Sequence, residues 1–470
     1  MTSSFLHPAL LLMAGALAVP LLRGTAKRLY LVLLPLASLV NLWLIPHGLH
    51  FETSFLGMEL IPAKVDKLSF LFGLAFHLVT VLGMVFALRN EDDTEQGFAL
   101  LYAGAVQGVV FAGDLLTLFL FWETLTITAT VLIWAHRTEQ ARNAGFRYLL
   151  VHAAGGLCLL LGILLRVQQT GSLEFGSIGL TDLSSALIFL GFGVNAAWPV
   201  LHAWLPDAYP AASPTGAVFL AAFTTKSAVY VLVRAFPGTE LLIYIGAVMA
   251  AFPIFYAIIE NDLRRVLSYS LINQVGFMMI GVGIGTELAL NGTCAHAFAH
   301  IIYKGLLFMS MGAVLRQTGK IKATDLGGLY RSMPWTALFC VIGAVSISAF
   351  PFTSGFVSKS MIVSAAAEHH LVLIWLVLVF ASAGSFVKTG VKVPYFAFFG
   401  HDAGHRVREA PWPMLLAMGG AAFLCLAIGI YPGPLYRLLP FGGEYMPYTA
   451  YHVVTQLQLL KGSANCSSVS

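Results

Sequence analysis

The chain has 470 residues, of which 58% are hydrophobic and only 10% are charged. An ordinary soluble domain carries roughly 25% charged residues, so this composition excludes a water-soluble globular protein. The formal net charge of +4 does not indicate a nucleic-acid partner, because the basic residues are distributed among loops and do not form a patch. The five cysteines follow no CxxC or metal-ligand spacing, so we expect no metal, redox cofactor or disulfide.

Apolar runs of about 17 to 25 residues recur along the chain, and each is long enough to cross the roughly 30 Å hydrocarbon core of a bilayer. We therefore predict an all-α polytopic membrane protein with about 14 transmembrane helices. The first run lacks the basic stretch that precedes a signal peptide, so we interpret it as a retained helix. The predicted helices cover residues 8–22, 28–46, 67–88, 97–112, 114–135, 145–167, 183–210, 214–235, 239–260, 264–284, 288–316, 333–367, 371–399 and 412–432.

Basic residues fall mainly in alternate loops between these helices. Because cytoplasmic loops are enriched in lysine and arginine, these loops are predicted to face the cytoplasm. With an even number of spans, both termini are then predicted on the outer side of the cell inner (plasma) membrane. The loops concerned carry Arg23, Lys27 and Arg28; Arg89; Arg137, Arg142 and Arg147; Arg264 and Arg265; Arg316, Lys320, Lys322 and Arg331; and Arg406 and Arg408.

Two predicted segments are too long for a simple span and are interrupted by proline. The seventh contains Pro199, and the twelfth contains Pro351. Proline removes a backbone donor, and the freed carbonyls are tolerated at membrane depth only where protein or a wet cavity surrounds them. Paired breaks of this kind mark the ion site of secondary transporters, and their separation by five helices predicts two inverted five-helix repeats.

These breaks predict a division of the chain into four parts. Residues 1–96 hold helices 1–3, and residues 97–235 form the first inverted repeat, helices 4–8. Residues 236–400 form the second repeat, helices 9–13, and residues 401–470 hold helix 14 and a C-terminal tail.

Two ionisable residues, Glu123 and Lys226, lie near the middle of their predicted spans. An ionised group at this depth costs roughly 2.5–3.5 kcal/mol, so a compensating function is the economical explanation. We predict that both residues take part in proton transfer. The alternative is a buried ion pair or hydrogen bond that fixes helix packing.

The stretch HAFAHIIYKGLLF places His296, His300 and Lys304 at four-residue intervals along one stripe of the eleventh helix. A neutral imidazole accepts on one nitrogen and donates from the other, so such a stripe can relay protons. Packing histidines and a metal site are the alternatives, although no third metal ligand is apparent nearby in the sequence.

Further ionisable residues lie near the two breaks. Lys359 follows the second break, where it can exchange a proton with trapped water, and Lys388 on the thirteenth helix is predicted to be the last relay before an exit. Lys392 lies near the basic end of that helix and is interpreted as an interfacial anchor. His202 and Asp207 lie around the first break and are predicted either to cap exposed backbone or to admit protons.

Five motifs occur in order between about residues 65 and 400: GDLLTLFLFWE, HAWLPDAYPAASP with TTKSAVYVLVR, NDLRRVLSYSLINQVGF, HAFAHIIYKGLLF and FPFTSGFVSK. They resemble the antiporter-like subunits shared by Mrp cation/proton antiporters and complex I, and most of all the D-type (MrpD-like) component of Mrp. The resemblance implies fourteen helices, two inverted repeats and broken seventh and twelfth helices. It also implies a proton path through Glu123, Lys226, His300 or Lys304, and Lys359.

One position departs from the family pattern. Family members carry a lysine before the first break, in a pattern similar to KAAxFPLHxWLPDA, whereas this chain reads NAAWPVLHAWLPDA with Asn195 at that place. Asparagine carries neither a proton nor a charge, so Glu123 lacks the partner that the resemblance implies. Either another lysine such as Lys226 takes that part, or the first half of the path is silent.

The favoured hypothesis is a proton-translocating subunit of a multi-subunit, Mrp-like Na+/H+ antiporter. It would have no catalytic site or cofactor of its own, and its partners would be other membrane subunits, protons, Na+ as a second candidate ion, and lipid. One alternative is a subunit of a complex I-like, hydrogenase-like or inorganic-carbon-uptake complex. Another is a coupling scaffold that no longer conducts, which Asn195 favours.

Overall fold

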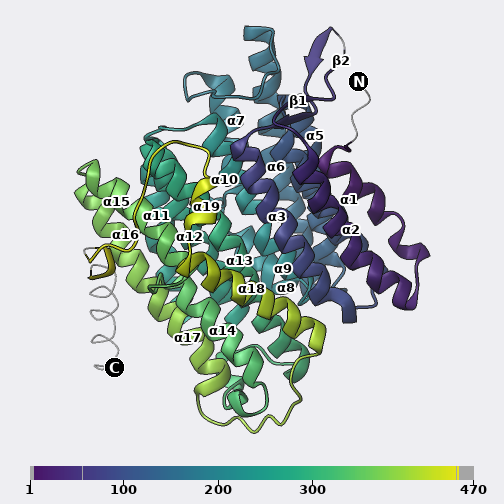
Figure 1. Ribbon diagram of the computed structural model, residues 1–470, viewed down its shortest axis with the longest axis vertical. Coiled ribbons are helices and arrows are strands. Elements are labelled where there is room, and N and C mark those ends of the chain that lie inside the picture. The colour runs from purple at the N-terminus through teal and green to yellow at the C-terminus, as the bar shows by residue number, and fades with distance from the viewer. Residues whose placement is uncertain (1–4, 56, 451, 455–470) are drawn as a thin grey trace. The chain divides into compact units, whose positions relative to one another are not determined.

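The computed structural model describes residues 5–55, 57–450 and 452–454 (Figure 1). Within these residues, ten helices are long and apolar enough to cross a membrane, and three further apolar helices are shorter. The predicted all-α polytopic membrane fold is confirmed. The last part of the predicted C-terminal tail, residues 455–470, lies outside the described residues.

The chain divides into two compact units, residues 1–237 and 238–470, which are described in turn. The four-part division into repeats stays a prediction. The first unit contains α1 (Pro8–Ala16), α2 (Gly24–Leu44), β1 (Gly48–His50), β2 (Thr53–Phe55), β3 (Met58–Leu60), β4 (Ala63–Val65), α3 (Lys67–Phe86), α4 (Asp93–Phe111), α5 (Leu115–Trp134), α6 (Glu139–Thr170), α7 (Leu183–Asn195), α8 (Trp204–Ala211), α9 (Gly216–Ala222) and α10 (Thr224–Ala235).

At the centre of the second unit is α13, which is buried along nearly its whole length, as expected of a helix inside a bundle. The helices of this unit are α11 (Leu241–Ile259), α12 (Leu263–Ile284), α13 (Glu287–Thr318), α14 (Pro334–Ile347), α15 (Ser354–Glu368), α16 (Val372–Ser385), α17 (Lys392–Pro394), α18 (Trp412–Ile430) and α19 (Gly433–Arg437), with π-helical turns at Phe386–Val391 and Tyr395–Phe399.

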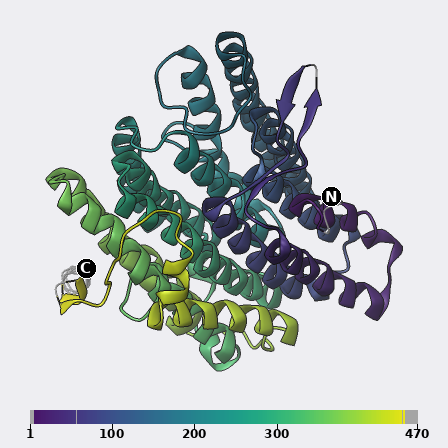
Figure 2. The same ribbon diagram turned by 45° about the horizontal axis from the view of Figure 1, so that its top comes forward.

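Between α2 and α3 the sequence indicated only a connection, but the structure has two short antiparallel strand pairs there. Strand β1 pairs with β4, and β2 pairs with β3. These strands form a narrow ribbon that projects from the helices of the first unit (Figure 2). Three-residue strands carry too little alternating pattern to be recognised in a sequence.

Close packing of α6 against α7 depends on glycine. A Cβ atom on Gly162 would lie 2.7 Å from the carbonyl oxygen of Ser184, and one on Gly191 would lie 2.9 Å from the carbonyl oxygen of Gly155. Only a residue without a side chain allows the two backbones to approach this closely. This contact holds the end of α7, and therefore the first break, against the middle of α6.

Both predicted breaks are present, and a third was missed. The seventh segment separates into α7 and α8, and the twelfth into α14 and α15. The predicted helix 214–235, however, is also interrupted, at Phe223 between α9 and α10. The cause is a side chain from another helix: the amide N–H of Thr224 donates to the hydroxyl of Tyr102, 3.1 Å away, in place of an intrahelical carbonyl.

At the start of α3, Asp66 caps the helix and pairs with Arg234 at the end of α10, with 2.9 Å between guanidinium and carboxylate. Burial alone would raise the pKa of Asp66, but hydrogen bonds from Arg234 and Ser69 outweigh it and hold the pKa below its usual range. The stability contributed by this pair is therefore full above the pKa of the unfolded carboxyl and is lost as the pH falls through the lowered folded value.

Replacing Asp66 by asparagine is expected to lower the free energy of unfolding by about 1–2 kcal/mol, because Asn still caps the helix but no longer neutralises a buried guanidinium. Asp182 is the matched control, since it caps α7 with the same Ser-containing capping box. Thermal unfolding of the purified variants measures the difference. Equal losses for Asp66→Asn and Asp182→Asn would show that only the cap matters.

Candidate functional site: buried lysines at helix breaks

In the first unit, Lys226 lies just after the break between α9 and α10 and is fully buried. Its ammonium donates to the carbonyl oxygen of Ala221, 2.6 Å away, and to the hydroxyl of Thr225, 3.0 Å away. The last carbonyls of a helix lack intrahelical partners and attract positive charge. The break thus supplies the acceptor that holds the lysine inside the protein.

A cluster of hydroxyl and aromatic side chains adjoins this break. The hydroxyl of Thr224 hydrogen-bonds the phenol of Tyr102 and, at 3.1 Å, the phenol of Tyr148. His152 stacks on Tyr148 with ring centroids 3.8 Å apart, and Trp204 meets it edge-on at 4.5 Å. These residues were not predicted from the sequence, although Tyr148 and His152 share a stripe of α6 with the same four-residue spacing as the two histidines of α13.

Glu123 on α5 is half-buried, and its carboxylate lies against the backbone of α6. A Cβ atom on Gly156 would lie 2.0 Å from Oε1 of Glu123. Among the described residues, this oxygen has no hydrogen-bond partner. Next to it, Gly155 contacts Val194, the residue before Asn195. Helix α6 therefore separates the glutamate from the end of α7.

Asn195 is the last residue of α7 and is fully buried. Neither its amide nitrogen nor its amide oxygen has a hydrogen-bond partner within the described part of the chain. Beyond it the backbone turns through left-handed conformations at Ala197 (φ 58°) and Val200 (φ 71°). The break that contains Pro199 therefore begins at the residue that departs from the family pattern.

The two polar residues predicted around this break lie at its margin. Asp207 in α8 is partly exposed and accepts a hydrogen bond of 2.6 Å from the exposed guanidinium of Arg147. His202 is half-buried in the connection between α7 and α8. Asp207 thus forms an ion pair near the protein surface. That His202 and Asp207 cap exposed backbone or admit protons stays a prediction.

In the second unit, Lys359 is fully buried and lies in the second turn of α15. Its ammonium donates to the carbonyl oxygen of Ile347, the last residue of α14, at 2.7 Å, and stands 5.0 Å from the ring centre of Phe277. The intervening connection contains Pro351 and two left-handed residues, Ala349 (φ 56°) and Phe352 (φ 67°). The arrangement repeats that of the first unit: a buried lysine donates to the end of a broken helix.

The predicted stripe on α13 is present and fully buried. The rings of His296 and His300 are 6.1 Å apart, and Tyr303 meets His300 edge-on at 5.2 Å. His296 hydrogen-bonds Ser358, the residue before Lys359, at 2.9 Å. Lys304 continues the stripe and is equally buried.

Lys388 and Lys392 have different surroundings. Lys388 is fully buried within the π-helical turn after α16, and no hydrogen-bond partner for its ammonium occurs among the described residues. Lys392 is partly exposed and donates to three backbone carbonyls at the end of α11, at 2.6–3.1 Å. Lys392 therefore has the contacts of an anchor, whereas Lys388 lies in the interior.

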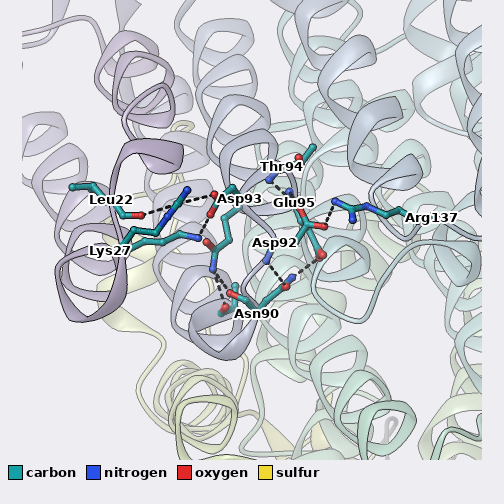
Figure 3. A network of polar contacts seen from close by, with 11 residues as sticks. Leu22, Lys27, Asn90, Asp92, Asp93, Thr94, Glu95 and Arg137 are labelled. Atoms are coloured by element: carbon teal, nitrogen blue, oxygen red, sulfur yellow. Dashed lines mark hydrogen bonds and ion pairs between the residues drawn. The ribbon is translucent and has the colours of Figure 1, made fainter.

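A second polar network, which the sequence did not predict, surrounds the start of α4 (Figure 3). Glu95 is almost completely buried and accepts hydrogen bonds from the hydroxyl of Ser213 and, at 2.7 Å, from the amide of Asn90. Asp92 pairs with Arg137 at 2.8 Å. These contacts fix the start of α4 to the connection between α8 and α9.

Beside this network lies a cavity of about 350 Å³, lined in part by Lys27 and Gln96. Asp93 pairs there with Lys27 (Figure 3). It also pairs with Arg23 at 2.8 Å. Charged side chains of both signs therefore line this cavity. Throughout the described residues, no group of three or more His, Cys, Asp or Glu side chains is placed to hold a metal ion.

These features define a polytopic membrane protein whose helices are broken beside buried lysines, the architecture of ion-translocating membrane subunits. The chain belongs to the family described as NADH:quinone oxidoreductase/Mrp antiporter, TM, which matches residues 112–384. The family resemblance predicted from the motifs is confirmed.

Three relatives show the range of this family. The chain is 30% identical over 402 residues to the A/B component of a probable K(+)/H(+) antiporter of Rhizobium meliloti (strain 1021), and the match covers 78% of this chain and 40% of that protein. It is 33% identical over 384 residues to NADH-quinone oxidoreductase subunit N of Desulforudis audaxviator (strain MP104C), with 76% and 72% covered. A chain in the structure of the Mrp complex from Dietzia sp. DQ12-45-1b matches with a TM-score of 0.87 at 25% identity, covering 98% of this chain and 55% of that one. This chain thus spans less than two thirds of the length of two of these relatives.

Proposed function

We propose that this protein is a proton-translocating subunit of a multi-subunit membrane complex, of the Mrp Na+/H+ antiporter type. One observation carries the proposal: in each unit, a fully buried lysine donates to a backbone carbonyl at the end of a broken helix, Lys226 to Ala221 and Lys359 to Ile347. A deprotonated lysine still has two N–H groups. Each lysine can therefore lose and regain a proton without leaving its carbonyl unsatisfied.

The proposed path follows the fully buried and half-buried ionisable residues of the two units. In the first unit it includes Glu123 and Lys226; in the second it includes His296, His300, Lys304, Lys359 and Lys388. Each of the five residues in the second unit is fully buried, which is costly unless the charge has a use. The family to which the chain belongs, and the antiporter names of its relatives, support the same function.

The partners that we propose are other membrane subunits, because the named relatives are themselves components of larger assemblies. We place the chain in the cell inner (plasma) membrane with both termini on the outer side. The basic loops that follow α1 and α5 support this orientation, since lysine and arginine accumulate on the cytoplasmic side.

Proton flux into proteoliposomes that contain the assembled complex tests the proposal. For the wild-type complex, a sodium gradient is expected to drive acidification of the liposome interior, which a trapped pH-sensitive dye reports. Absence of flux from an assembled complex would contradict the proposal and favour the coupling scaffold. The buried amide of Asn195, which has no hydrogen-bond partner within the described residues, also favours the scaffold. Flux that requires electron transfer by a partner would favour a redox-driven complex, as the likeness to a quinone oxidoreductase component suggests.

The two units are expected to contribute unequally to flux. Replacing Lys226 by alanine should reduce the rate by no more than about threefold, because Asn195 already denies the first unit a titratable group at the end of α7. Initial rates for Lys226→Ala and Lys359→Ala, measured at equal protein density in the liposomes, provide the comparison. A loss for Lys226→Ala as large as that for Lys359→Ala would show that the first unit conducts despite Asn195.

A further inference from the structure

A chain of hydrogen bonds in the second unit connects α11, α12, α13 and α15 around His296. The side-chain amide of Asn273 donates to the carbonyl of Ala250, and that of Gln274 donates to Asn273 Oδ1 at 2.7 Å. Gln274 Oε1 lies 3.2 Å from Nε2 of His296, whose Nδ1 lies 2.9 Å from the hydroxyl of Ser358. All four side chains are fully buried.

The direction of every bond in this chain follows from its first member. A backbone carbonyl only accepts, so Asn273 presents its nitrogen to Ala250 and its oxygen to Gln274. Gln274 must then present its nitrogen to Asn273 and its oxygen to His296. An oxygen that only accepts requires a donor, so Nε2 of His296 carries a hydrogen. A second donor, the phenol of Tyr303, meets the same Gln274 oxygen at 3.3 Å.

His296 is therefore held in one tautomer, and only its Nδ1 atom is left to exchange a proton. This differs from the predicted relay, in which a histidine accepts on one nitrogen and donates from the other. Gln274 cannot take the Nε2 proton, because an amide oxygen is a very weak base. The residue beside Nδ1, Ser358, consequently determines how His296 exchanges protons.

The hydroxyl of Ser358 has two sets of acceptors within reach. It lies 2.9 Å from Nδ1 of His296, and it also lies 3.0 Å from the carbonyl oxygen of Ser354 and 3.3 Å from that of Gly355. A hydroxyl has one hydrogen and rotates to suit its neighbours. Both orientations are accommodated without movement of the backbone.

We propose that Ser358 is a hydrogen-bond switch that lets His296 take up and release a proton at Nδ1 while Gln274 holds the Nε2 proton in place. With neutral His296, Ser358 donates to Nδ1. To let a proton in, the Ser358 hydroxyl first turns its hydrogen to the carbonyl of Ser354, which exposes the Nδ1 lone pair. A protonated neighbour on the path, for which Lys359 is the candidate, then releases a proton and keeps the electron pair of the broken N–H bond, while the Nδ1 lone pair forms the new N–H bond. Ser358 then accepts from Nδ1. The inference rests on the proposed proton path and identifies positioning residues for it.

Flux measurements separate this switch from a merely structural hydroxyl. Serine in a helix commonly donates to the preceding turn, so a structural role for Ser358 is the alternative. Ser358→Ala is expected to reduce flux by about tenfold, whereas Ser358→Thr, which keeps the hydroxyl, should retain at least about half of it. Ser360→Ala is the matched control, because Ser360 is also buried on α15 but takes no part in the hydrogen bonds described around His296.

Wild-type flux in Ser358→Ala would overturn the switch, and so would equal losses in the alanine and threonine variants. Lys359→Ala distinguishes this failure from failure of the proposed function: if it conducts as the wild type does, the path itself is wrong. The tautomer is then decided independently by solid-state NMR of the complex labelled with ¹⁵N-histidine, with the His296 signal assigned by its loss in His296→Asn. A neutral ring protonated at Nε2 supports the inference, and one protonated at Nδ1 overturns it.

Discussion

Lys359→Ala is expected to reduce proton flux through the assembled complex by at least about tenfold, because the variant removes a proton carrier from the end of a broken helix. In the native chain the Lys359 ammonium donates to Ile347 at 2.7 Å, and alanine offers no replacement. The same change leaves the carbonyl of Ile347 without this donor, which costs about 1–3 kcal/mol when the group stays dry. Initial rates in proteoliposomes at matched protein density give the measurement.

Two further variants separate proton transfer from the structural part of that effect. Lys359→Arg keeps N–H donors near Ile347 but cannot release a proton at accessible pH, so it should conduct as poorly as Lys359→Ala. Lys392→Ala removes a lysine that donates to the end of α11 at the margin of the unit and should conduct normally. Wild-type rates for Lys359→Arg would mean that this lysine serves only as a helix cap.

The residues that were predicted from the sequence are those whose signal is local. A lysine or proline inside an apolar run stands out without any knowledge of the fold, and so Lys226, Lys359 and the breaks at Pro199 and Pro351 were identified. Their burial and their carbonyl partners follow from packing. The assignment of these residues to a proton path is a proposal that the flux measurements must decide.

The residues that were missed bond across long separations in the chain and carry no local signal. Tyr102 and Thr224 are 122 positions apart, and their contact creates the unpredicted break at Phe223. Gln274 is 111 positions from Ser385, to which it donates at 3.0 Å. Tyrosine, threonine and glutamine occur in many of this chain's apolar segments, so only the fold shows which of them meet.

Gly355→Ala is expected to lower the free energy of unfolding by about 3 kcal/mol, the upper part of the usual range for overpacking. A Cβ atom on Gly355 would lie 1.8 Å from the carbonyl oxygen of Ser346 and 2.9 Å from its carbonyl carbon. Both atoms belong to the backbone of α14, so no rotation of a side chain relieves the clash. Helices α14 and α15 must separate instead.

That separation also predicts a loss of flux, because the carbonyl bound by Lys359 belongs to Ile347, the residue after Ser346. Thermal unfolding of the purified complex gives the stability, and the liposome assay gives the rate. Gly176→Ala is the control, since a Cβ atom there would meet nothing within 4 Å. An unchanged unfolding temperature for Gly355→Ala would mean that the two half-helices are not packed as closely as the structure places them. A lowered unfolding temperature with normal flux would instead mean that conduction does not require the Lys359–Ile347 hydrogen bond, because a displacement of α14 from α15 breaks that bond.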